Sequence, residues 1–160
     1  QPAVRLRVIA VGTRMPAWVD TAFDDYARRL RGSWQLELTE IAPASRRQAG
    51  GAATAAIEHE TRRILALLSA REYVIALDER GHEWSTLELA RWLEQQRAEA
   101  RDLTFIIGGP DGLGAEVHKR GSRAWSLSRL TLPHALARVL LVEQLYRAAS
   151  VLAGHPYHRA

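Results

Sequence analysis

The chain has 160 residues, of which 47% are hydrophobic and 25% are charged, a composition typical of one globular domain with a substantial core. It contains no cysteine, which excludes disulfides, zinc–thiolate sites and thiol catalysis, and which is consistent with a cytoplasmic protein. No segment approaches the ~20 apolar residues of a membrane span, and no signal peptide is visible. We therefore expect a single domain over residues 1–160 and no membrane contact.

The net charge of +4 is unevenly distributed along the chain. Residues 1–116 have a balance of −2, whereas residues 117–160 have a balance of +6. A one-sided basic excess is typical of proteins that bind a polyanion such as RNA. A solvated cationic helix face would give the same pattern, so charge alone leaves both interpretations open.

Hydrophobic periodicity predicts strands that alternate with helices along the whole chain. The predicted strands cover residues 4–11, 34–41, 73–77, 103–107 and 124–127. The predicted helices cover residues 18–31, 54–69, 85–100 and 115–120, and a long last helix with Pro133 in its first turn. Ser85 and Glu88 have the spacing of a capping box, and Glu143 and Arg147 have the spacing of an ion pair within the last helix. Residues 42–51 are predicted to form a basic loop and residues 78–84 a second loop. The alternation predicts an α/β fold with a mostly parallel sheet of about five strands and helices on both faces.

Three predicted strands end in segments suited to a ligand. The fourth strand leads into a glycine-rich loop, Gly108-Gly109-Pro110-Asp111-Gly112-Leu113-Gly114, although such a loop is also a common structural turn. It has neither the dinucleotide-binding spacing nor the lysine of a P-loop, which disfavours a nucleoside triphosphate. The third strand ends at Leu77, and the fifth is followed by the mostly apolar residues 127–133. An apolar pocket rich in backbone groups suits an adenosine ring, although periodicity alone favours ordinary core for these leucines.

The C-terminal segment Gly154-His155-Pro156-Tyr157-His158-Arg159 is unusually rich in groups that move protons, stack on bases and hold phosphates. Because it follows a strongly apolar helix, we expect it to be anchored and to belong to a functional site. His134 and Arg138 project from the first turns of that helix, next to the proposed pocket. A metal site is not expected, since no cysteine and no acidic residue accompanies the histidines of the tail.

These motifs resemble those of one known family. The chain is similar to the RlmH (YbeA-like) proteins in residues 11–19 and 105–112 and in Trp125-Ser126-Leu127-Ser128. The resemblance continues through Leu130-Thr131-Leu132-Pro133-His134 and the tail His155-Pro156-Tyr157-His158-Arg159. It covers nearly the whole chain, with the motifs in the same order.

The resemblance implies a methyltransferase of the SPOUT (α/β-knot) superfamily that uses S-adenosylmethionine and no metal. The implied acceptor is N3 of a pseudouridine in the 23S rRNA of the assembled ribosome. The implied assembly is a homodimer in which the partner subunit helps to complete each active site. The implied fold contains a C-terminal trefoil knot, which periodicity does not predict because knots are nearly absent from proteins.

The resemblance also assigns individual residues. Those implied to hold S-adenosylmethionine, largely through backbone atoms, are Leu77, Gly108, Gly109, Leu127, Ser128, Arg129, Leu130, Thr131, Leu132 and Pro133. Those implied to face the RNA and carry catalysis are His134, Arg138, Tyr157, His158 and Arg159. His158 is the first candidate for the acceptor of the N3 proton. The alternatives are a SPOUT enzyme that acts on tRNA and a non-catalytic ribosome-binding module.

Overall fold

Five parallel strands form one sheet in the computed structural model, which describes residues 4–31, 34–44 and 53–159. The strands are β1 (Val4–Val11), β2 (Trp34–Ile41), β3 (Tyr73–Glu83), β4 (Leu103–Ile107) and β5 (Arg123–Ser126). Their order across the sheet is β2-β1-β4-β3-β5, and every neighbouring pair is parallel. The predicted fold class is therefore confirmed.

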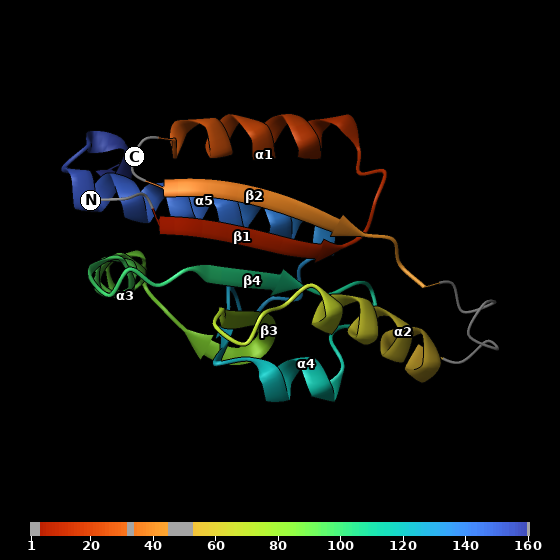
Figure 1. Ribbon diagram of the computed structural model, residues 1–160. Helices are drawn as coiled ribbons and strands as arrows, with labels where there is room; N and C mark the ends of the chain where they lie inside the picture. Colours follow the sequence, from red (N-terminus) through yellow and green to blue (C-terminus); the bar gives the residue numbers. More distant parts are fainter. Residues whose placement is uncertain (1–3, 32–33, 45–52, 160) are drawn as a thin grey trace.

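Helices cover both faces of this sheet (Figure 1). The helices are α1 (Ala17–Arg29), α2 (Ala53–Ala66), α3 (Thr86–Ala98), α4 (Ala115–Arg120) and α5 (His134–Ala153), followed by the 3₁₀ helix η1 (Pro156–Arg159). One core cluster joins α1, α3 and α5 to the sheet, and a second, smaller cluster joins α2 and α4 to the opposite face. The molecule thus has three layers, as buried parallel sheets require.

The alternation of side chains along β1 explains the two clusters. Val4, Leu6 and Val8 belong to the larger cluster, whereas Ile9 belongs to the smaller one. Successive residues of a strand point to opposite faces, so the second half of β1, which is covered on both faces, is continuously buried and apolar. β4 has the same character, because all five of its residues are buried.

The third strand differs from the prediction. We predicted a loop over residues 78–84, but β3 resumes after an excursion, and both Leu77 and His82 pair with Trp125 of β5. Gly81 allows this return, because a Cβ atom there would lie 2.7 Å from the carbonyl carbon of Ala124. The sequence signal was an isolated glycine, which marks a close backbone approach as readily as an open loop.

The helix ends follow local chemistry. Ser85 and Glu88 form the predicted capping box of α3, with the Glu88 N–H donating to Ser85 Oγ at 3.1 Å. Pro133 caps α5 instead of lying in its first turn. Most of the basic loop predicted for residues 42–51 lies outside the described residues.

The trefoil knot stays a prediction, because strand order and pairing do not by themselves define whether α5 passes through a loop. None of the described helices combines the length and the apolar character needed to cross a bilayer.

We expect the Gly81→Ala variant to lose about 1–3 kcal/mol of unfolding free energy, because the new Cβ would overlap the backbone of β5. Chemical denaturation measures this loss. Arg80→Ala is the matched control, since Arg80 is an exposed residue of the same excursion and its replacement should cost less than about 0.5 kcal/mol. Equal stabilities of the two variants would contradict the close approach.

Candidate active site

The carboxyl ends of the parallel strands meet at one edge of the sheet, where ligands of open α/β folds bind. The residues implied to hold the cofactor are Leu77, which lies within β3 where its excursion begins, and the segments that follow β4 and β5. These three strands are neighbours in the sheet. The structure therefore brings Leu77, Gly108, Gly109 and residues 127–133 to the same edge.

The glycine-rich loop after β4 folds back on itself. The Gly112 N–H donates to the carbonyl oxygen of Gly109 at 3.0 Å, and Gly112 has a φ of +83°. A Cβ atom on Gly108 would lie 2.8 Å from the carbonyl carbon of Gly112 and 2.9 Å from Leu113 Cγ. No larger residue fits at Gly108 without movement of the loop, so the backbone itself lines this part of the edge.

The segment after β5 is held by short polar contacts. Ser126 Oγ donates to the carbonyl oxygen of Ser128 at 2.8 Å, and the Leu130 N–H donates to Ser128 Oγ at 3.0 Å. Thr131 Oγ1 donates to Glu79 Oε2 at 2.9 Å, which links the segment to the excursion of β3. Leu130 is 73% exposed, far more than an ordinary core leucine. These contacts favour a ligand-facing segment over ordinary core.

A small cavity of about 140 Å³ lies behind this segment. It is lined by Trp84, Ser85, Leu89, Trp125, Leu127, Leu140 and Gln144. The indole N–H of Trp125 is buried and has no hydrogen-bond partner among the described residues. An apolar recess with one unused donor, next to exposed backbone groups, fits part of a nucleoside-containing ligand.

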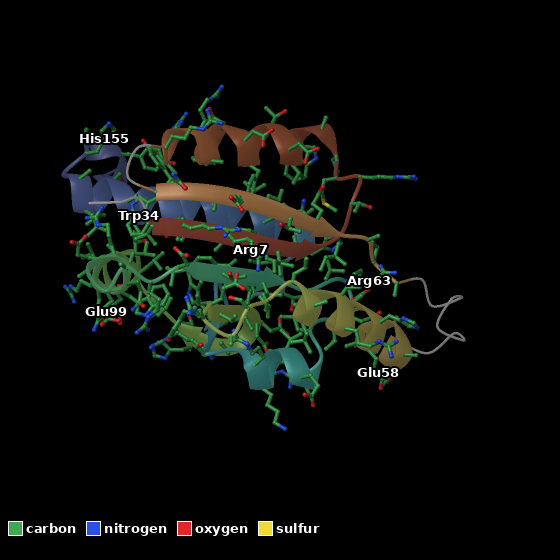
Figure 2. The ribbon with its side chains drawn as sticks, in the orientation of Figure 1. Arg7, Trp34, Glu58, Arg63, Glu99 and His155 are labelled. Carbon is green, nitrogen blue, oxygen red and sulfur yellow. The ribbon has the colours of Figure 1, made fainter. Side chains whose placement is uncertain are left out.

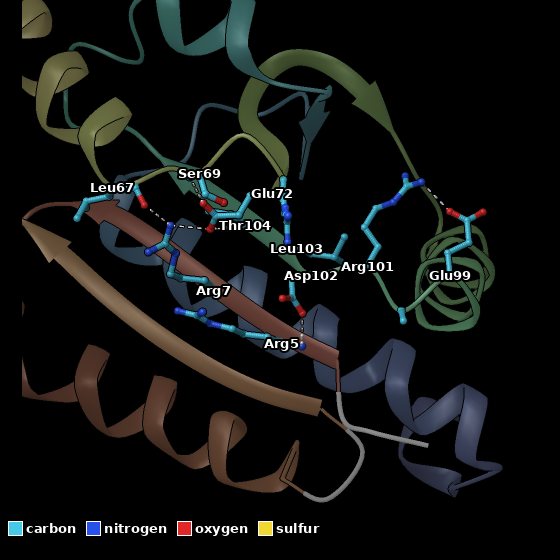
Figure 3. A pocket seen from close by; sticks show the side chains of 12 residues that line it. Arg5, Arg7, Leu67, Ser69, Glu72, Glu99, Arg101, Asp102, Leu103 and Thr104 are labelled. Carbon is cyan, nitrogen blue, oxygen red and sulfur yellow. Dashed lines mark hydrogen bonds and ion pairs between the residues drawn. The ribbon is translucent and has the colours of Figure 1, made fainter.

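A larger hollow, of about 580 Å³, lies at the opposite edge of the sheet (Figure 3). Three of its arginines form ion pairs within the protein: Arg5, Arg7 and Arg101. Arg7 donates to Glu72 at 2.6 Å and to the carbonyl oxygen of Leu67 at 2.7 Å. Burial alone would raise the pKa of Glu72, but hydrogen bonds from Ser69 and Thr104, with Arg7 alongside, lower it. The larger hollow is therefore an ion-pair network that ties β1, β3 and β4 together, and the smaller features at the other edge form the better candidate site.

The first turns of α5 close the candidate site on the β1 side. Arg138 is only 1% exposed, forms an ion pair with Glu40 at the end of β2, and donates to the carbonyl oxygen of Gly12 at 3.2 Å. Gly12 has a φ of +141°, and a Cβ atom there would lie 3.4 Å from His134 Cδ2. The imidazole of His134 thus lies against the turn that Arg138 holds.

The burial of Arg138 favours a positioning role over direct contact with RNA. Its guanidinium forms an ion pair with Glu40 and donates to the carbonyl oxygen of Gly12, so it connects the start of α5 to the ends of β2 and β1. The expectation that Arg138 faces the RNA stays a prediction.

The tail is anchored, as expected. The hydroxyl of Tyr157 donates to Glu143 at 3.1 Å and lies 3.3 Å from the hydroxyl of Tyr26. The guanidinium of Arg147 lies 4.8 Å from the centre of the Tyr157 ring and also pairs with Glu143 at 2.9 Å, which confirms the predicted ion pair within α5. Burial raises the pKa of Tyr157, and its contacts with Tyr26 and Glu143 raise it further, so the phenol stays protonated. The side chains of His158 and Arg159 lie outside the described residues.

The two groups of predicted catalytic residues lie at opposite ends of α5 (Figure 1). His134 and Arg138 lie beside the end of β1, whereas Tyr157 contacts Tyr26 near the end of α1, at the edge where β1 begins. A helix of 20 residues spans about 30 Å. One protomer therefore does not bring its own tail to its own strand-end site.

Sequence reasoning missed three residues at this edge: Gly12, Glu40 and Glu60. Glu60 is buried, and its Oε1 would lie 3.6 Å from a Cβ atom on Gly109. Helical spacing could have revealed it, because Glu60 lies between the inward-facing Ile57 and Ile64. No comparable signal identifies Glu40, since its partner is 98 residues away.

An all-parallel sheet with a glycine-rich loop and a backbone-rich segment at its carboxyl edge has the arrangement in which open α/β folds bind ligands. A family model described as predicted SPOUT methyltransferase matches residues 4–158. The chain therefore belongs to the SPOUT methyltransferase family.

Curated relatives resemble the chain over its whole length. It is 52% identical to a protein named ribosomal RNA large subunit methyltransferase H from Alkalilimnicola ehrlichii, over 98% of this chain and 100% of that one. A protein of the same name from Laribacter hongkongensis is 48% identical over 98% of this chain and 99% of its own.

Among solved structures, a probable methyltransferase from Bordetella pertussis matches 91% of this chain and 94% of its own, with a TM-score of 0.54 and 18% identity. At such low identity the match supports the fold alone.

We expect Arg138→Met to lower the unfolding free energy by about 2–3 kcal/mol, because the substitution leaves Glu40 without its partner. The value lies below that of a fully buried pair, since the Glu40 side chain is 35% exposed. Chemical denaturation of Arg138→Met, of the double variant Glu40→Gln/Arg138→Met and of wild type measures it. The double variant should be more stable than Arg138→Met.

The matched control is Arg129→Ala. The exposed side chain of Arg129 lies 3.8 Å from Glu83, and its ion pair should contribute less than about 0.5 kcal/mol to the unfolding free energy. If Arg138→Met costs no more than this control, the buried pair does not hold the site together.

Proposed function

We propose that this protein transfers the methyl group of S-adenosylmethionine to N3 of a pseudouridine in the 23S rRNA of the assembled ribosome. The observation that carries the proposal is the match over the whole chain, strand-end segments and tail included, to relatives named ribosomal RNA large subunit methyltransferase H. A non-catalytic ribosome-binding module would need neither the glycine-rich loop nor the backbone-rich segment after β5.

The residues at the strand ends fit the methyl donor. Gly108 and Gly109 allow the closest backbone approach, and Leu77 with residues 127–133 offers apolar surface and backbone groups on either side. Trp125, whose buried indole N–H has no partner among the described residues, lines the recess behind them. When bound, S-adenosylmethionine supplies a methyl carbon already activated by its sulfonium, so the chemistry needs no metal.

The protein must hold N3 of the pseudouridine against the methyl carbon and accept the proton that N3 loses. Positioning accounts for most of the acceleration in such a direct displacement. His158 is our candidate for the proton acceptor, directly or through water, and Arg159 is our candidate for binding phosphate or developing negative charge. Tyr157 is protonated and is held by Glu143 and Arg147. These contacts support a role in which the Tyr157 ring fixes the tail that carries His158 and Arg159.

The separation of about 30 Å along α5 supports a homodimer with composite sites. Two copies packed antiparallel along α5 would place the tail of one beside His134 of the other. Trp18 on α1 and Leu136 on α5 are 56% and 37% exposed, and both lie in the first turns of helices that start at the site edge. Apolar exposure of this kind supports an interface there.

Methyl transfer from labelled S-adenosylmethionine tests the function directly. Assembled ribosomes, isolated large subunits, naked 23S rRNA and tRNA from a strain lacking the modification should be offered, and the labelled nucleoside identified by mass spectrometry. We expect label on pseudouridine in assembled ribosomes only. Label on tRNA would mean that the substrate is tRNA and not 23S rRNA. Cofactor binding without methyl transfer to any of these RNAs would contradict the proposal.

Subunit mixing tests the composite site. We expect the His134→Ala and His158→Ala homodimers each to transfer methyl groups slowly. Heterodimers made by co-expression of the two, with different tags, should recover activity, because one of their two sites combines an intact strand edge with an intact tail. An equal mixture should reach about a quarter of wild-type activity, since half of the dimers are mixed and each has one intact site. No recovery in purified heterodimers would mean that each site is built within one subunit.

A further inference from the structure

Glu60 of α2 is a buried carboxylate that the proposed chemistry does not yet use. It is only 7% exposed, and its Oε2 accepts the N–H of Ala44 at 3.0 Å. Its Oε1 is the oxygen that lies beside Gly109, at 3.6 Å from the position of a Cβ. The carboxylate thus lies against the loop implied to hold the methyl donor.

The helix around Glu60 is packed closely onto that loop. A Cβ atom on Gly114 would lie 2.5 Å from Oγ1 of Thr61, the residue after Glu60. α2 therefore contacts the glycine-rich loop near both of its ends, which fixes the backbone of Glu60 relative to Gly109.

The charges around Glu60 favour a cationic ligand. Burial raises the pKa of Glu60, and the negative charge of Asp111 in the same loop raises it too, against a hydrogen bond from Ala44 and the charge of Arg63, which lower it. Arg63, labelled in Figure 2, directs its Nη1 to the carbonyl oxygen of Ala42 at 2.9 Å. A desolvated carboxylate in this setting gains most from a nearby positive charge.

We propose that Glu60 distinguishes the methyl donor from the spent product by charge. The inference rests on the proposed function, because it takes the glycine-rich loop as the cofactor site. S-adenosylmethionine carries a sulfonium cation, whereas S-adenosylhomocysteine, which remains after transfer, has a neutral thioether and is otherwise alike. Glu60 attracts the first more than the second, so it favours loading of the donor and release of the product.

Glu60→Gln tests this proposal, because glutamine keeps the shape and the oxygen that accepts the Ala44 N–H while removing the charge. Calorimetry should give the affinities of wild type and variant for S-adenosylmethionine and S-adenosylhomocysteine, with no RNA present. We expect the ratio of the two affinities to fall by roughly tenfold in the variant, from the Coulomb energy of a partly screened pair several ångströms apart. The affinity for S-adenosylhomocysteine should stay the same or rise.

Glu58→Gln is the matched control, since Glu58 carries the same charge on the exposed side of the same helix (Figure 2). It should leave the ratio unchanged. An equal loss of both affinities in Glu60→Gln, or no loss of either, would overturn the proposal and leave Glu60 with a structural role.

A pH series on wild type gives a second readout that does not depend on the folding of a variant. The ratio of affinities should fall as the pH is lowered through the raised pKa of Glu60, because protonation removes its charge. Groups that the two ligands share cancel in this ratio. The window from about pH 8 to pH 5 reaches down towards the range in which carboxylates titrate. If the ratio of affinities in wild type stays constant across this window, the proposal is overturned. Failure of wild type to bind either ligand would instead overturn the proposed function, and the two failures are thereby distinguished.

Discussion

The ion pair between Arg138 and Glu40 is the contact on which the candidate site depends. It joins the first turns of α5 to the end of β2, and its second hydrogen bond fixes the turn at Gly12 after β1. A buried guanidinium is costly unless its hydrogen bonds are satisfied, and Arg138 Nε is buried without a partner among the described residues. The pair therefore fixes the arrangement of three segments more than it adds stability. His134 then lies against the turn at Gly12, which Arg138 holds in place through the carbonyl oxygen of Gly12. Pro133 is the N-cap of α5, so the position of the helix start also determines where Pro133 and the segment before it lie.

α5 has a second task at its other end, where it presents the tail. Gly154 ends the helix in the left-handed conformation, with a φ of +71°, and the His155 N–H donates to the carbonyl oxygen of Ser150 at 2.8 Å. Tyr157 then packs 4.6 Å from the ring of Tyr146 and binds Glu143. One rigid helix therefore sets both the strand-edge group and the tail group. In a symmetric pair of subunits, a single packing angle along α5 would align both composite sites at once.

Local rules account for most of what the sequence predicted. The strands, the capping box of α3 and the Glu143–Arg147 pair depend on neighbours within a few residues, or on the alternation of apolar positions. The positions of the cofactor segments followed from one further rule, that parallel strands end at the same edge. Two features depend on contacts between residues that are distant in the chain: the excursion at Gly81 and the ion pair between Glu40 and Arg138. Hydrophobic periodicity does not predict such contacts. The separation of the tail from His134 needed the direction of α5 relative to the sheet, which pattern alone did not provide.

The basic excess of residues 117–160 has a different meaning once each cation is placed. Arg138 and Arg147 pair with Glu40 and Glu143, and Arg120 donates to the carbonyl oxygens of Ser69 and Glu72. Among the described cations of this region, Lys119 and Arg129 are the ones with exposed side chains.

Counting charges along the sequence therefore overstates the positive surface that one protomer can offer to RNA. Each phosphate contact adds to affinity and to its salt dependence, so residues 117–160 of one protomer contribute less to non-specific binding than their net charge suggests. Exposed arginines also lie outside this region, among them Arg14, Arg71 and Arg91, so the fold and not the C-terminal sequence decides where the cationic surface lies. Folded RNA is recognised largely by its shape, so the proposed ribosomal target does not rest on the charge of the C-terminal region alone.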